Sequence, residues 1–135
     1  MILVDTSVWI DYFRGASTRQ ADYLQQAIQR DDDLCTCGII VTEILQGIPS
    51  DEELREVKND LASLIFLPMP DQSYYLAANI YRKAKSKGLM IRSTIDCLIG
   101  ACAIENGAIL LQNDKDYQAI ARVSSLRLIV IGQFE

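Results

Sequence analysis

Short, largely apolar runs alternate with longer amphipathic stretches along this chain of 135 residues. The apolar runs cover residues 1–4, 34–36, 66–67, 108–111 and 126–131. Runs of this kind are typical of strands buried on both faces of a parallel sheet. We therefore predict five short strands, the last of which closes the sheet.

Amphipathic stretches fill the segments between these runs. Apolar positions recur there every three or four residues, which predicts seven helices. The predicted helices cover residues 6–13, 16–30, 39–46, 51–64, 71–87, 93–105 and 114–123. Ser50 and Glu53 match a capping box, and glycines such as Gly15 and Gly88 follow helix ends. The alternation predicts the α/β class, with a short parallel sheet covered by helices in one domain, residues 1–135.

The composition is that of a globular protein, because 50% of the residues are hydrophobic and 23% are charged. No basic leader precedes the first apolar run and no apolar segment is long enough to span a bilayer, so we expect a cytoplasmic protein without a membrane segment. The four cysteines are interpreted as reduced, buried thiols. A zinc site is disfavoured because the chain has no histidine and no C-x-x-C spacing.

The formal net charge is −5. This acidity argues against a general nucleic-acid coat protein, since phosphate binding normally requires a basic excess. It is compatible with an enzyme whose acids gather at a site that a metal ion neutralises.

Four acids lie where such a site is expected. Asp5 follows the first predicted strand at once, and Asp114 comes just after the strand over 108–111. In open α/β sheets, ligands bind beyond the carboxyl ends of the strands. Glu43 falls in the helix after the second strand and Asp96 in the first turn of the helix over 93–105. We expect these four side chains to converge at one end of the sheet.

Each acid also has a structural interpretation. Asp96 could complete a capping box with Ser93, Asp114 could be an ordinary N-cap, and Asp116 could favour the helix dipole. Asp5 could cap the first helix. Glu43 is harder to explain in this way because its segment is otherwise apolar, and a buried carboxylate needs a partner such as a metal ion.

Four motifs in order resemble those of the PIN-domain ribonucleases of the VapC-toxin type. They are Val4-Asp5-Thr6-Ser7, Thr42-Glu43, Thr94-Ile95-Asp96-Cys97-Leu98-Ile99-Gly100-Ala101 and Asn113-Asp114-Lys115-Asp116-Tyr117. The resemblance covers nearly the whole chain. Two departures are mild: Gly100 stands where many relatives carry Ala, and Tyr117 where many carry Phe.

The resemblance implies a PIN-like three-layer α/β/α fold and a toxin that cleaves RNA with bound Mg²⁺ or Mn²⁺. It also implies a VapB-like antitoxin as inhibitor and a homodimer. Carboxylate oxygens suit hard divalent ions. Asp5 and Asp96 would be the most direct ligands, and Glu43 and Asp114 would hold a second ion or orient metal-bound water. Asp116 is the alternative fourth acid.

Basic and aromatic residues supply candidates for partner binding. The basic ones, which could follow an RNA backbone or simply form a solvated helix end, are Arg14, Arg82, Lys83, Lys85, Lys87 and Arg92. Trp9, Tyr12 and Phe13, together with Ile48, could form a groove for the antitoxin or belong to the core.

Three other classes compete with the nuclease. A phosphatase of the haloacid-dehalogenase type would use Asp5 as a covalent nucleophile, but it requires a second acid at position 7, which is Ser7. A phospho-receiver domain requires paired acids early in the chain and an acceptor Asp that ends a central strand. A non-catalytic binding module would leave Glu43 without an explanation.

Overall fold

The computed structural model describes residues 1–132 and contains a four-stranded parallel sheet. The strands are β1 (Ile2–Val4), β2 (Leu34–Thr36), β3 (Ile65–Phe66) and β4 (Ile109–Leu111), in the spatial order β3-β2-β1-β4. Ile2 pairs with Leu34 on one side and with Ile109 on the other. The chain builds β2 and β3 to one side of β1 and β4 to the other, so the strand order reverses between β1 and β4.

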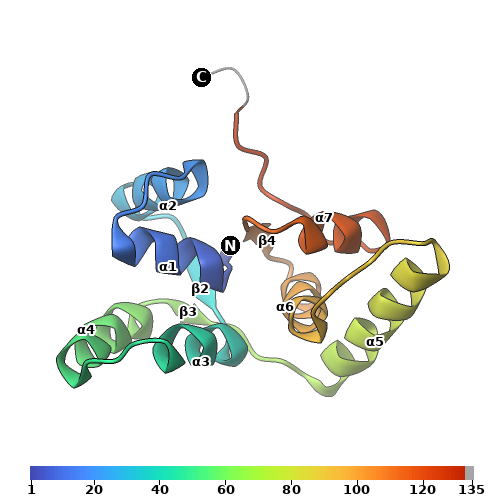
Figure 1. Ribbon diagram of the computed structural model, residues 1–135, viewed down its shortest axis with the longest axis horizontal. Helices are drawn as coiled ribbons and strands as arrows, with labels where there is room; N and C mark the ends of the chain where they lie inside the picture. The colour runs from blue at the N-terminus through green and yellow to red at the C-terminus, as the bar shows by residue number, and fades with distance from the viewer. Residues whose placement is uncertain (133–135) are drawn as a thin grey trace.

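Within residues 1–132, seven helices pack around this sheet (Figure 1). They are α1 (Thr6–Arg14), α2 (Arg19–Gln29), α3 (Gly38–Gln46), α4 (Asp51–Ala62), α5 (Asp71–Ser86), α6 (Thr94–Glu105) and α7 (Lys115–Arg122). In Figure 1, α1 and α2 lie above the strands, α3 and α4 lie below them, and α5 to α7 lie on the side of β4. The predicted α/β fold with a short, helix-covered parallel sheet is confirmed.

The short apolar runs form the strands because most of their side chains are buried. Leu3, Val4, Leu110 and Leu111 are fully buried. The edge strand β3 differs: Phe66 is 62% exposed. The prediction of burial on both faces therefore holds for most residues of β1, β2 and β4 and is wrong for β3, whose two residues are both exposed.

The helix boundaries mostly agree with the periodicity. The second helix begins at Arg19 rather than at residue 16, because Thr18 caps it by accepting a hydrogen bond from the Ala21 N–H. Ser50 caps α4 as predicted, accepting from the Glu53 N–H. Gly15, which follows α1, has a φ of 70°, a backbone conformation that favours glycine.

The predicted closing strand over 126–131 is wrong. That segment forms a single parallel bridge, between Leu110 and Leu128. The Leu110 N–H donates to the Arg127 carbonyl, and the Ile129 N–H donates to the Leu110 carbonyl. β4 ends at Leu111, so the residues after 129 have no strand beside them to pair with.

All four cysteines are buried and free, as predicted. The buried apolar side chains of residues 1–132 form one core cluster that runs from β1 to the segment after α7. Within residues 1–132, none of the helices has both the length and the apolar character needed to cross a bilayer.

Candidate active site

The site forms where the strand order reverses, at the carboxyl ends of β1 and β4. Asp5 directly follows β1, and its backbone N–H donates to the carbonyl of Leu111 at the end of β4. Only 6% of Asp5 is exposed. Although Asp5 occupies the N-cap position of α1, its side chain makes no capping hydrogen bond. The cap interpretation of Asp5 is therefore wrong.

The carboxylate of Asp5 is held by two hydroxyl groups. The Tyr117 hydroxyl donates to Asp5 Oδ1 over 2.8 Å, and the Ser7 hydroxyl donates to Asp5 Oδ2 over 3.1 Å. Burial raises the pKa of Asp5, while the Tyr117 hydrogen bond lowers it in part. A nearby cation would stabilise the charged form of such a buried carboxylate.

Asp96 lies in the first turn of α6 and joins the same cluster. Its Oδ1 is 3.3 Å from the Tyr117 hydroxyl. Ser93, at the N-cap of α6, makes no side-chain capping hydrogen bond, so the predicted capping box does not form. The pKa of Asp96 rises to about 7, first because of partial burial and then because of the negative charges of Asp5 and Asp114.

The start of α7 adds two more acids. Asp114 is the N-cap, and its Oδ1 accepts from the Asp116 N–H over 2.9 Å. Asp114 therefore caps α7, as its structural interpretation predicts, and it also belongs to the acidic cluster. Asp96, Asp114 and Asp116 each offer an oxygen within 4.8 Å of the other two. Both Asp114 and Asp116 therefore lie in the cluster, and both remain candidates for the fourth acid.

Glu43 approaches from α3 on the other side of Asp5. Its Oε1 accepts a hydrogen bond of 2.7 Å from the Thr6 hydroxyl, and its charge contributes to the raised pKa of Asp5. Glu43 is half-buried rather than buried, since α3 buries Ile40 and Ile44 instead. Glu43 therefore lies beside Asp5, outside the group formed by Asp96, Asp114 and Asp116.

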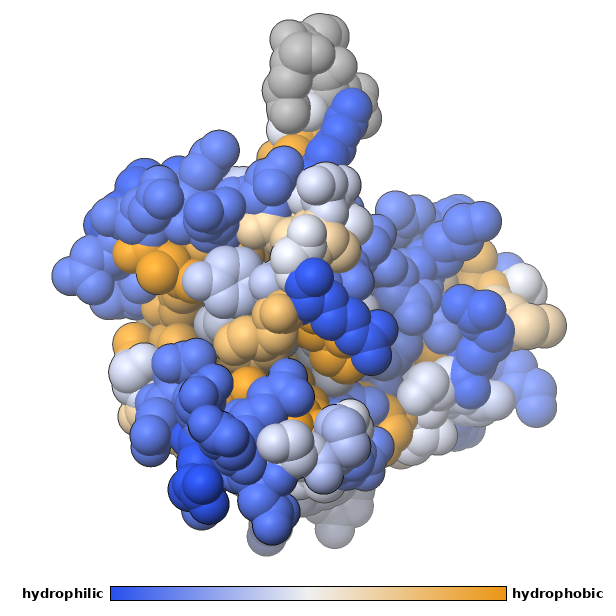
Figure 2. Space-filling model, turned by 60° about the vertical axis from the view of Figure 1, so that its left-hand side comes forward, coloured by the Kyte–Doolittle hydropathy of each residue, from blue (hydrophilic) through white to orange (hydrophobic). Residues whose placement is uncertain are grey.

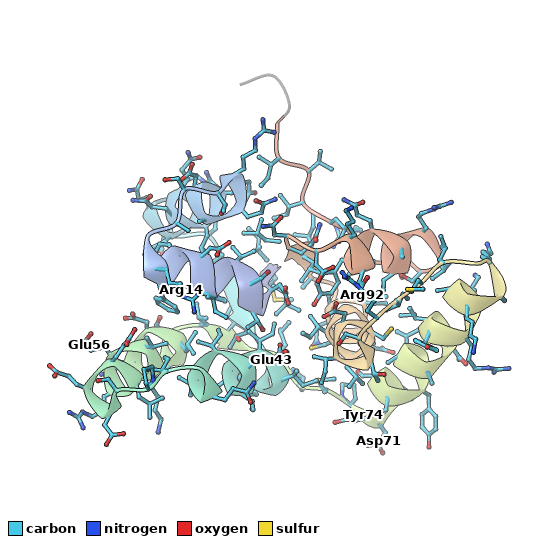
Figure 3. All side chains as sticks on the ribbon, in the orientation of Figure 1. Arg14, Glu43, Glu56, Asp71, Tyr74 and Arg92 are labelled. Atoms are coloured by element: carbon cyan, nitrogen blue, oxygen red, sulfur yellow. The ribbon has the colours of Figure 1, made fainter. Side chains whose placement is uncertain are left out.

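Among the six basic candidates, Arg92 alone contacts these acids within residues 1–132. Its backbone N–H donates to Asp116 Oδ2 over 2.9 Å. Its guanidinium lies 3.5 Å from both Asp114 Oδ1 and Asp116 Oδ1. Figure 3 shows Arg92 beside the starts of α6 and α7, whereas Arg14 lies at the far end of α1. The other four, Arg82, Lys83, Lys85 and Lys87, are exposed along α5 and at its end.

The aromatic candidates on α1 form one cluster. Trp9 stacks on Phe13 with ring centroids 5.6 Å apart and meets Tyr12 edge-on at 5.9 Å. Trp9 is only 3% exposed, and Tyr12, Phe13 and Ile48 are half-buried. Of the two roles expected for these residues, Trp9 has that of a core residue.

Sequence reasoning did not identify Tyr117 as a site residue. An aromatic side chain three residues after a helix cap is usually a core residue, and the ring of Tyr117 is indeed fully buried. Its hydroxyl nevertheless reaches both Asp5 and Asp96. The only signal in the sequence was the replacement of Phe by Tyr within a recognisable motif.

This donor set fits a hard divalent cation. It consists of carboxylate oxygens alone, without the histidine or thiolate that softer metals favour. Burial, followed by the charges of Asp5 and Asp114, raises the pKa of Asp96, and a cation bound here would oppose that rise. The molecule therefore belongs to the class of α/β proteins that carry a carboxylate site, suited to a divalent metal ion, where the strand order reverses.

Comparison with known proteins identifies the family. The PIN domain model matches residues 2–123. The chain is 35% identical to the VapC ribonuclease Mb1587 of Mycobacterium bovis over 129 residues, covering 94% of this chain and 96% of the relative. It is 33% identical to ribonuclease VapC32 of Mycobacterium tuberculosis, with coverages of 95% and 96%. The chain therefore belongs to the PIN-domain family, in its VapC branch, which sets aside the phosphatase and receiver alternatives.

Solved structures agree in fold. The structure of VapBC2 from Rickettsia felis bound to a promoter DNA fragment matches with a TM-score of 0.75 and 18% identity, covering 96% of this chain and 98% of the other. VapBC-1 from nontypeable Haemophilus influenzae matches with a TM-score of 0.74 and 21% identity, with coverages of 96% and 97%.

Proposed function

We propose that this protein is a metal-dependent endoribonuclease and the toxin of a VapBC-type pair. The observation that carries the proposal is the cluster of Asp5, Asp96, Asp114 and Asp116 at the sheet's switch point, with Glu43 beside it. The names of the relatives, which are ribonucleases, support RNA as the substrate. Reduced thiols and an RNA substrate both suit the cytoplasm.

Asp5, Asp96, Asp114 and Asp116 would hold Mg²⁺ or Mn²⁺. When bound, such an ion lowers the pKa of its water and stabilises charge on a phosphate oxygen. Ser7 and Tyr117 hold Asp5 in one orientation through its two oxygens. Thr6 holds Glu43 beside Asp5, where the carboxylate can bind a second ion or accept a proton from the attacking water.

Arg92 supplies the positive charge next to this centre. Its side chain is 68% exposed, and its guanidinium contacts to Asp114 and Asp116 are long, so it can turn toward an RNA phosphate. Arg92 would contact the RNA next to the bond that is cleaved. The exposed basic residues of α5, together with Arg14, would contact the RNA backbone farther away.

The experiment that tests the proposal is cleavage of a single-stranded RNA by the purified protein with Mg²⁺, with Mn²⁺ and with excess chelator. We expect cleavage with either ion and none with chelator. Cleavage that persists in chelator would overturn the metal mechanism. Release of phosphate from a small ester, with no cleavage of RNA, would overturn the assignment as a nuclease.

We further propose that a VapB-like antitoxin binds beside α1. Trp9 and Tyr12 line a pocket of about 390 Å³ between α1, the end of α2 and the end of α4. Figure 2 shows apolar side chains in the hollow between the polar surfaces of α1 and α2 above and α3 and α4 below. The volume lies within the usual range for ligand pockets.

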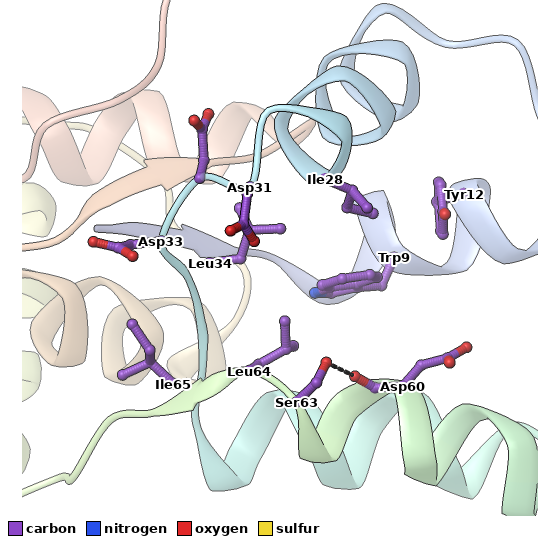
Figure 4. Close-up of a pocket in the computed structure, with 11 residues that line it drawn as sticks. Trp9, Tyr12, Ile28, Asp31, Asp33, Leu34, Asp60, Ser63, Leu64 and Ile65 are labelled. Atoms are coloured by element: carbon purple, nitrogen blue, oxygen red, sulfur yellow. Dashed lines mark hydrogen bonds between the residues drawn. The ribbon is translucent and has the colours of Figure 1, made fainter.

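The chemistry of this pocket favours a basic peptide. The indole Nε1 of Trp9 is buried and has no hydrogen-bond partner among residues 1–132. Figure 4 shows this nitrogen turned toward the space between Leu34 and Leu64. A backbone carbonyl of the antitoxin would accept from it once the side chains around it move apart, because the nitrogen has no exposed surface in the free protein. Asp31, Asp32, Asp33 and Asp60 also line the pocket and would attract a lysine or arginine.

A second apolar surface suits the expected homodimer. Phe66, Tyr74 and Ile95 are exposed and line one groove together with Ile39 and Met69. Exposed aromatic and methionine side chains in one patch are typical of protein interfaces. Light scattering at high micromolar concentration tests this proposal: a dimer is expected, and a monomer would count against it.

A further inference from the structure

Tyr117 places one polar atom between two acids of the candidate site. Its ring is fully buried in α7, and the hydroxyl is 2.8 Å from Asp5 Oδ1 and 3.3 Å from Asp96 Oδ1. A phenol has a single proton, so it donates to one carboxylate at a time, and the shorter distance assigns that proton to Asp5. One hydroxyl therefore links the end of β1 with the starts of α6 and α7.

The ring of Tyr117 packs in the core, whereas its hydroxyl contacts two acids of the candidate site. A phenylalanine would fill the same space in the core. Burying a hydroxyl costs free energy unless it is hydrogen-bonded, and the partners of this hydroxyl are both carboxylates of the candidate site. The benefit of the hydroxyl therefore lies at the site rather than in the packing of α7.

The two hydrogen bonds on Asp5 leave it with one fixed orientation. Oδ1 accepts from Tyr117 and Oδ2 from Ser7, and each oxygen retains a lone pair for a metal ion. Groups that hydrogen-bond to metal ligands fix their direction, and losing them typically weakens metal binding by about 10- to 100-fold.

We propose that the Tyr117 hydroxyl is a positioning group that fixes Asp5 relative to Asp96, so that a divalent ion binds without rearrangement of these carboxylates. The inference rests on the proposed metal-dependent function and extends it to a residue outside the acidic set.

Calorimetric titration with Mn²⁺ alone tests the proposal on the wild type, Tyr117→Phe and a matched control, Tyr75→Phe. Tyr75 is 73% exposed on α5, so its hydroxyl should not matter. We expect the Kd for Mn²⁺ to rise about 10- to 100-fold in Tyr117→Phe and to stay unchanged in Tyr75→Phe. Cleavage by Tyr117→Phe should be restored by excess Mn²⁺, with an unchanged KM for RNA.

A Kd for Tyr117→Phe within twofold of the wild-type value would overturn the role of Tyr117 while leaving the metal site intact. No Mn²⁺ binding by the wild type would overturn the proposed metal dependence itself, so the two failures are distinguishable. If Tyr117→Phe does not fold, Ser7→Ala decides, because Ser7 is half-buried and makes the other hydrogen bond to Asp5. Unchanged Mn²⁺ affinity in that variant would overturn the proposal.

Discussion

The backbone N–H of Arg92 donates to the carboxylate of Asp116 over 2.9 Å, which fastens the segment before α6 to the first turn of α7. This bond does not depend on the side chain of Arg92. Substitution of the side chain therefore removes the guanidinium from the site without removing the link between the two segments.

We predict that Arg92→Ala raises the KM for single-stranded RNA several-fold and reduces the slope of log binding against log salt by about 1, as expected for the loss of one phosphate contact. Arg55→Ala, an exposed substitution on α4, is the matched control and should change neither quantity. Filter-binding at several salt concentrations measures both. Equal salt slopes for Arg92→Ala and the wild type would exclude a phosphate contact.

The raised pKa of Asp96 predicts an unusual pH dependence of stability. Its folded pKa of about 7 lies above the ordinary value of about 4, so the folded state holds an extra proton between these values. This contribution to stability is fully present below about pH 4 and is lost as the pH rises through about 7. Without metal, the melting temperature should therefore be lower at pH 8 than at pH 5.

Asp96→Asn should reduce this pH dependence and melt higher than the wild type at pH 8 in chelator, because one charge leaves the cluster. Free Mg²⁺ at about a hundred times its Kd should stabilise the wild type by roughly 2.7 kcal/mol and the variant by much less. A lower melting temperature for the metal-free variant, with an unchanged response to Mg²⁺, would mean that Asp96 stabilises α6 and lies outside the site.

The buried indole of Trp9 provides a test of the antitoxin surface. Trp9→Phe keeps a large ring but removes the N–H, so the complex should lose one hydrogen bond, about 1 kcal/mol or roughly a fivefold increase in Kd. The probe is a VapB-like antitoxin encoded beside this gene, to be identified first from the neighbouring reading frames, and Tyr75→Phe is the control. Equal affinity of wild type and Trp9→Phe would remove the proposed contact.

Much of the fold was predictable from local pattern. The strands β1 and β4 are short apolar runs, and acids that directly follow such strands meet at one edge of the sheet. The pattern therefore correctly predicted that Asp5 and Asp114 lie at this edge of the sheet. The closing strand was wrong because its residues are apolar but β4 is too short to pair with them.

Contacts between distant residues could not be predicted in the same way. The bond from Tyr117 to Asp5 joins positions 112 residues apart, and nothing local to Tyr117 indicates that its hydroxyl meets a carboxylate. Likewise, Glu43 lies in an apolar segment but is half-buried, because the exact rotation of α3 on the core decides which side chains it buries.

The most direct test of the carboxylate site is cleavage of a single-stranded RNA by Asp96→Asn across a series of Mg²⁺ concentrations. The matched control is Asp71→Asn, which changes an exposed acid at the start of α5. We predict that Asp96→Asn remains folded but cleaves no RNA at any Mg²⁺ concentration, whereas Asp71→Asn cleaves like the wild type. If folded Asp96→Asn cleaved RNA at the wild-type rate, the proposed carboxylate site would be contradicted.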